Sequence, residues 1–138
     1  MRIYKYVIIN RISGPVLDKD KGWHVTKKLD LSTMKKGAKK LIGTKDFSTF
    51  RAASCNAKNA IRTIDMIKIN ILNNKIEIRI KSQSFLQQQV RSMVGCLKYL
   101  GENKWTLKEF DEVIKSKKRI FCAPPAPPEG LFLLKVIY

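Results

Sequence analysis

The chain has 138 residues, 44% of them hydrophobic, so it has the length of one domain and can bury a core. Its 28 Lys and Arg residues against 11 Asp and Glu give a formal net charge of +17, which favours a polyanionic partner, nucleic acid before a membrane surface. No apolar run approaches the roughly 20 residues of a membrane span, so no membrane association is expected.

Cysteine and histidine usage bears on metal sites and on the redox compartment. Cys55, Cys96 and Cys122 lie far apart and form no C-x-x-C pair, so neither a disulfide framework nor a zinc site is indicated. The single histidine, His24, has no second histidine with which to hold a metal. We therefore expect reduced thiols, no metal and a cytoplasmic location, and residues 1–3 lead into strand-like sequence rather than a signal peptide.

Residues 2–10 predict the first strand, because apolar side chains occupy both alternating positions. Tyr4 taken alone fits a core aromatic ring better than a binding residue. A polar loop follows, with too many turn residues for a regular element. It includes Ser13, Asp18, Asp20, Trp23 and His24. We interpret its aspartates as solvated carboxylates.

Residues 31–42 predict a helix that Asp30 caps and Gly43 ends, with lysines on its outer face. Residues 46–53 predict a turn that packs two phenylalanine rings and presents Arg51. Taken alone, Arg51 is an ordinary surface charge.

Residues 63–72 and 75–82 predict a hairpin joined at the pair 73–74, where two asparagines tolerate the positive φ of a tight turn. The second strand alternates strictly, so its isoleucines are expected in the core and its charged side chains on a wet or RNA-facing surface.

Residues 86–100 predict the central helix. Its apolar stripe at helical spacing is Leu86, Val90, Met93, Val94 and Leu97. Arg91 falls on the flank of this stripe, which allows two interpretations. Either its stem packs on the core and its guanidinium reaches water, or the partly buried guanidinium holds a carboxylate.

Thr106 and Glu109 form a capping box that opens another helix, and a basic cluster at residues 115–119 complements the dipole at its end. The proline-rich residues 123–130 could bind another protein as a polyproline helix, but we favour a rigid loop before a last strand, residues 131–138. The sequence thus predicts one α+β domain over residues 1–138, with a mostly antiparallel sheet packed on one face by two or three helices and a basic cleft on the other.

Several motifs resemble, in order, those of the TruA family of bacterial tRNA pseudouridine synthases. They are Tyr4-Lys5-Tyr6, Asp46-Phe47-Ser48-Thr49-Phe50-Arg51-Ala52, the F-x-x-x-x-V-R-x-x-V-G pattern from Phe85 to Gly95, and the ending Ala123-Pro124 through Gly130-Leu131. Gln87-Gln88-Gln89 and Ser92 depart from the family, which commonly has histidines, methionine and asparagine there.

The resemblance implies a role for each matching residue. Tyr4 stacks on the target uracil, and Arg91 pairs with the nucleophilic aspartate and keeps it ionised. The implied RNA-binding residues are Arg51, Lys58, Arg62 and Phe85. The implied substrate is the anticodon stem and loop of tRNA, the reaction needs no cofactor or metal, and the complete enzyme is expected to be a homodimer.

The nucleophilic aspartate of that family belongs to a G-R-T-D-x-G-V-H motif, which this sequence lacks. The chain is therefore expected to be the C-terminal portion of the enzyme and inactive alone, with Arg91 near Tyr4 and without a carboxylate partner. The alternative is a stand-alone basic RNA-binding module that has the fold without the catalysis.

Overall fold

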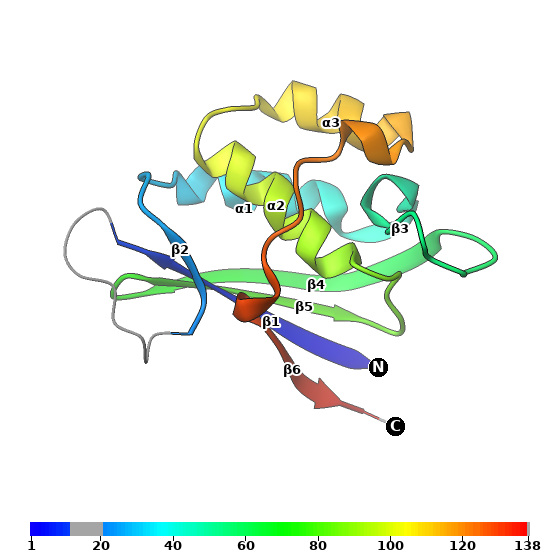
Figure 1. The fold of residues 1–138 in the computed structure, drawn as a ribbon, viewed down its shortest axis with the longest axis horizontal. Coiled ribbons are helices and arrows are strands. Elements are labelled where there is room, and N and C mark those ends of the chain that lie inside the picture. The colour runs from blue at the N-terminus through cyan, green and yellow to red at the C-terminus, as the bar shows by residue number, and fades with distance from the viewer. Residues whose placement is uncertain (12–20, 138) are drawn as a thin grey trace.

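The sheet of this chain is built around β1 (Arg2–Asn10), as a computed structural model that describes residues 1–11 and 21–137 shows (Figure 1). The strand order is β2 (Trp23–Val25), β1, β5 (Lys75–Ser82), β4 (Ile61–Leu72) and β3 (Gly43–Asp46), and β6 (Leu131–Val136) also pairs with β1. All of these pairs are antiparallel except β1 with β2. With three helices in the described residues, the α+β prediction is confirmed.

The strand β2 lies where the sequence predicts only an irregular loop, and that part of the prediction is wrong. A three-residue strand has too few positions to show a period, and tertiary pairing decides it. Ile8 pairs with Trp23, and Asn10 Nδ2 donates hydrogen bonds to the carbonyls of Val25 (3.0 Å) and Lys27 (2.7 Å). The predicted loop residues 13–20, with both aspartates, lie outside the described residues.

The predicted hairpin is confirmed in β4 and β5, with Asn73 in its turn at a φ of 57°. β4 starts two residues earlier than expected, at Ile61, because its first residues pair with β3. On β5 the side chains of Ile76, Ile78 and Ile80 are buried, as the alternation predicts. The register of β4 against β5 therefore follows the hydrophobic pattern of the sequence.

The helices α1 (Leu31–Leu41), α2 (Gln89–Gly101) and α3 (Leu107–Ser116) lie on the same side of the sheet (Figure 1). Asp30 caps α1 by accepting from Thr33 N, and the capping box that opens α3 is present. No helix of the described residues is long and apolar enough to cross a membrane.

The central helix α2 starts at Gln89, three residues later than predicted. Gln88 has a left-handed φ of 64°, which interrupts the helical path. The fully buried side chain of Gln89 turns back and accepts a hydrogen bond from the backbone N–H of Leu86 (2.8 Å). The apolar stripe of α2 is buried, as the spacing predicts.

The sequence predicts a loop over residues 123–130; in the structure residues 122–127, which we call the proline-rich segment, pack along α2 and a short helical turn follows. Ala123 and Ala126 are buried, and Ala126 N donates to Arg91 O (2.9 Å). A Cβ on Gly95 would lie 2.2 Å from Pro124 O, so only glycine allows this approach of loop and helix. The segment continues through η3 (Pro128–Gly130) into β6.

Tyr6 of β1 links the proline-rich segment to the sheet. Its side chain is fully buried, and its hydroxyl donates to the carbonyl of Pro127 (2.5 Å). Burial raises the pKa of the Tyr6 phenol well above its usual 10.0, and the nearby Arg91 cation offsets this only in part. Tyr6 therefore has a structural role.

We expect Gly95→Ala to destabilise the chain by about 1–3 kcal/mol, because the new methyl group meets a backbone carbonyl that cannot turn aside. Gly101→Ala in the same helix is the matched control. Its methyl group meets the flexible Met34 side chain at 2.8 Å, so the loss should stay below about 1 kcal/mol. Urea melts of both variants test this, and equal losses would contradict the close packing at Gly95.

We expect Tyr6→Phe to reduce the loss of unfolding free energy that alkaline pH causes in the original chain. A phenol whose pKa is raised on folding contributes stability that is complete below its unfolded pKa of about 10 and is lost as pH rises above it. Phenylalanine cannot ionise, so this loss disappears, while the missing bond to Pro127 costs about 0.5–1.5 kcal/mol at neutral pH. Urea melts from about pH 8 to about pH 11 measure both. Parallel curves for the two proteins would contradict the raised pKa.

Candidate active site

A cavity of about 320 Å³ lies beside the first turn of α2, on the side of the sheet that carries the helices. It is lined by Arg2 and Tyr4 of β1, residues 85–91 and Leu131 of β6. Three residues that the sequence singles out, Tyr4, Phe85 and Arg91, therefore meet at one cavity although 81 positions separate Tyr4 from Phe85. Pairing of β1 with β5 and β6 brings them together.

Tyr4 reaches the cavity from the middle of the sheet. It pairs with Ile80 of β5 on one side and with Leu133 of β6 on the other. Its half-buried ring packs edge-to-face on Phe85, with centroids 5.2 Å apart and an interplanar angle of 82°. Within the described part of the chain, its hydroxyl has no hydrogen-bond partner. The ring is thus fixed in orientation while its polar tip is available to a ligand.

Arg91 is half-buried at the start of α2, and the proline-rich segment orients it. Its Nε donates to the carbonyl of Ala126 (2.7 Å), while the N–H of Ala126 donates to the carbonyl of Arg91 (2.9 Å). Among the residues that the structure describes, no carboxylate lies within 4.0 Å of the guanidinium. The guanidinium is therefore placed by a backbone carbonyl, and its remaining N–H groups can bind an oxyanion.

Arg51, Lys58 and Arg62 do not line the cavity; they lie on what we call the basic loop, residues 51–60 together with the first two residues of β4, 61 and 62. Arg51 Nη1 donates to Ala57 O (3.4 Å), and Arg62 Nη1 donates to the carbonyl of Ile61 (2.7 Å). Lys58 is exposed. The loop joins the cavity where Ala52 N donates to the carbonyl of the lining residue Gln87 (2.9 Å).

The surroundings of Cys55 on the basic loop lower the pKa of its thiol. The backbone N–H groups of Ala57 and Gln87 lower the pKa of Cys55, and the cations of Arg51 and Arg62 lower it further. Both guanidinium groups therefore lie near the Cys55 thiol on the basic loop.

Sequence reasoning missed Arg119 as a residue near the site. The basic cluster at the end of α3 was expected to complement the helix dipole, but α3 ends at Ser116 and Arg119 turns back in η2 (Arg119–Phe121). Its guanidinium donates to Ser92 Oγ (2.6 Å) and to Gln88 Oε1 (3.3 Å). It thus fixes the left-handed residue that opens α2. No local signal could reveal a contact across 31 positions.

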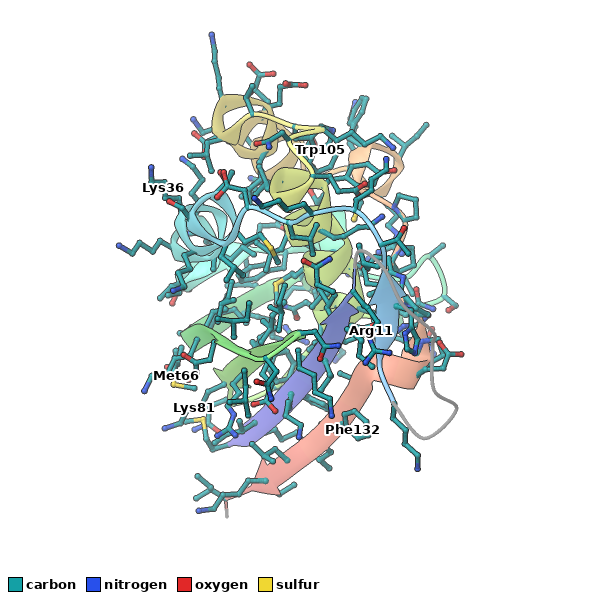
Figure 2. All side chains as sticks on the ribbon, turned by 90° about the vertical axis from the view of Figure 1, so that its left-hand side faces the viewer. Arg11, Lys36, Met66, Lys81, Trp105 and Phe132 are labelled. Atoms are coloured by element: carbon teal, nitrogen blue, oxygen red, sulfur yellow. The ribbon has the colours of Figure 1, made fainter. Side chains whose placement is uncertain are left out.

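In the part of the chain that the structure describes, no helix covers the other face of the sheet (Figure 1), and basic side chains of β1, β4 and β5 lie there in cross-strand rows. One cross-strand row joins Lys68, Arg79 and Lys5, and the next joins Met66, Lys81 and Ile3. Glu77 forms ion pairs with Lys5 (3.9 Å) and Arg79 (3.7 Å), and Lys5 lies over the ring of Phe132. Figure 2 labels Met66, Lys81 and Phe132 in this sheet layer. Whether this face forms the predicted basic cleft stays a prediction.

Within residues 1–11 and 21–137, no three His, Cys, Asp or Glu side chains come together as metal ligands would.

The chain is similar to known proteins along almost its whole length. The chain is 70% identical over 137 residues to a protein of Pelagibacter ubique (strain HTCC1062), 42% identical to one of Parvibaculum lavamentivorans and 43% identical to one of Rhizobium leguminosarum bv. trifolii. Each of the three is named tRNA pseudouridine synthase A. The match covers 99% of this chain in each case but 56%, 56% and 51% of the relatives, so the chain spans about half their length. A sequence profile described as tRNA pseudouridine synthase matches residues 38–138, and the chain therefore belongs to the tRNA pseudouridine synthase family.

Proposed function

We propose that this chain is the C-terminal portion of a tRNA pseudouridine synthase, and that it isomerises uridine in the anticodon stem and loop of tRNA once a further segment supplies the nucleophilic aspartate. One observation carries the proposal: Tyr4 and Arg91 line the same cavity, and the described residues give Arg91 no carboxylate partner. A guanidinium that is oriented but has no anion suits a carboxylate from elsewhere.

The reaction breaks the bond between uracil N1 and ribose C1′, turns the base and joins C5 to C1′; C5 then loses its proton and N1 takes one up, so the composition is unchanged. In our proposal Arg91 orients the incoming aspartate and lowers its pKa, so that it stays ionised as a nucleophile. The bond from Arg91 Nε to Ala126 O supports this role, because it leaves the outer edge of the guanidinium for a bidentate contact.

Tyr4 is proposed to stack on the target uracil. Its ring is held edge-on by Phe85, so that it loses little freedom when a base binds. A base that turns during the reaction needs a surface that keeps its position. The ring of Tyr4 provides such a surface, because its backbone is paired with a strand on each side. Phe85 then contributes by supporting Tyr4 and by lining the same cavity.

The tRNA backbone is proposed to lie on the basic loop, where Arg51, Lys58 and Arg62 adjoin the cavity. The net charge of +17 supports attraction of RNA in general, and the position of the loop supports this particular path. We also propose that the complete enzyme is a homodimer, that it is located in the cytoplasm and that it needs no cofactor.

In the full-length protein, Arg91→Met should reduce turnover by orders of magnitude, because the aspartate loses its partner and its orientation. Tritium release from tRNA labelled at uridine C5 measures turnover, and Lys108→Met on the exposed surface of α3 is the control. A melt of Arg91→Met checks its fold, since loss of the bond to Ala126 should cost only about 1–3 kcal/mol. A folded variant with normal turnover would overturn the catalytic role.

The isolated chain should bind tRNA but release no tritium, because the described residues place no carboxylate at Arg91. Affinity should fall steeply with salt, by about 0.7–0.9 log units per log unit of salt for each phosphate contact. Arg51→Glu and Arg62→Glu should weaken binding more than Lys39→Glu, which reverses an exposed charge on α1. Equal effects would indicate diffuse attraction only. Tritium release by the isolated chain would contradict the need for a further segment.

A further inference from the structure

Two of the three cysteines meet between α2 and the proline-rich segment, although the sequence places them 26 positions apart. Cys96 lies in α2, and Cys122 follows η2 at the start of the proline-rich segment. Their sulfur atoms are 3.6 Å apart, close enough for a hydrogen bond between the thiols. The third thiol, Cys55, belongs to the basic loop and takes no part in this contact.

We propose that Cys96 and Cys122 form a site of reversible oxidation, at which a peroxide attacks through Cys122 and Cys96 completes an intramolecular disulfide. The two sulfur atoms differ in access, which assigns these roles. Cys122 is only partly buried, whereas Cys96 is fully buried in the helix. Of the two, Cys122 can therefore meet an oxidant from solvent, and Cys96 is the cysteine in contact with it.

The surroundings favour the same division of roles. The hydrogen bond with Cys96 and the cation of Arg119 lower the pKa of Cys122 against the opposing effect of burial, so a larger fraction of this thiol is ionised than of an ordinary cysteine. The contact with Cys122 and its own burial raise the pKa of Cys96, so Cys96 keeps its proton until the second step. A thiolate that is partly exposed and beside a cation is the form that reacts with peroxide.

The chemistry balances with one equivalent of hydrogen peroxide. The Cys122 thiolate attacks one peroxide oxygen, the O–O bond breaks, and Cys122 becomes a sulfenic acid while hydroxide leaves and takes up a proton. The Cys96 sulfur then attacks the Cys122 sulfur, and the S–O bond breaks. The departing hydroxide takes the Cys96 proton, so two thiols become one disulfide and the peroxide becomes two waters.

The geometry requires only a small movement. A disulfide has an S–S length of about 2.05 Å, so the sulfur atoms must approach by about 1.5 Å from their distance of 3.6 Å. Cys122 lies in extended backbone, where its side chain can shift more easily than that of Cys96 inside a helix. The disulfide would join the proline-rich segment covalently to α2, five positions after Arg91.

The test treats the folded chain with hydrogen peroxide and maps its disulfides by mass spectrometry after blocking free thiols. We expect a single Cys96–Cys122 disulfide, which dithiothreitol reverses, with Cys55 outside any intramolecular disulfide. The same treatment in urea is the control, because an unfolded chain with three thiols should give all three pairings. A folded chain that gives the same mixture, or that oxidises Cys55 while Cys96 and Cys122 stay reduced, would overturn the proposal.

Two variants test which sulfur atom reacts first. In Cys96→Ser, Cys122 should stop at the sulfenic acid, which a diketone reagent traps. In Cys122→Ser, the buried Cys96 thiol should survive the treatment that consumes the pair in the original chain. Trapping of Cys96 and not Cys122 would overturn the assigned order. If either variant fails to fold, the disulfide map of the unaltered chain still decides whether the pair forms.

Discussion

The pair of hydrogen bonds between Arg91 and Ala126 holds the site together. The N–H of Ala126 donates to the carbonyl of Arg91, and Arg91 Nε donates to the carbonyl of Ala126. One pair of residues thus orients the guanidinium and fixes the proline-rich segment on α2. Because that segment leads into β6, the same contact helps to place β6 beside β1, where Leu131 completes the cavity.

The start of α2 combines a strained backbone residue with a buried polar side chain. Gln88 adopts a left-handed φ of 64°, and Gln89 is fully buried. Both cost free energy unless partners compensate. The amide of Gln89 accepts from Leu86 N, and Arg119 donates to Gln88 and to Ser92. The first turn of α2 is therefore held by side chains from distant parts of the chain, so that the cavity keeps a defined wall before any ligand binds.

The family relationship and the geometry support each other at different levels. The relatives place the chain in a family of tRNA pseudouridine synthases, while fold alone would not identify a reaction. The cavity shows which side chains lie close enough to act together, since Tyr4, Phe85 and Arg91 all line it. The basic loop contacts the cavity wall through Gln87. In the proposed function, base recognition and phosphate attraction thus come from neighbouring but separate surfaces.

The sequence by itself determined the elements whose signals are local. Alternation predicted β5, the asparagine pair predicted the turn before it, and the capping box predicted the start of α3, since each depends on residues a few positions apart. Motif resemblance also singled out Tyr4 and Arg91.

Only the tertiary structure decided what depends on distant contacts. These are the strand β2, the later start of α2, the turn of Arg119 toward Gln88 and the meeting of Cys96 with Cys122. Their cause is the pairing of strands and the packing of the proline-rich segment, which join residues tens of positions apart and leave no period in the sequence.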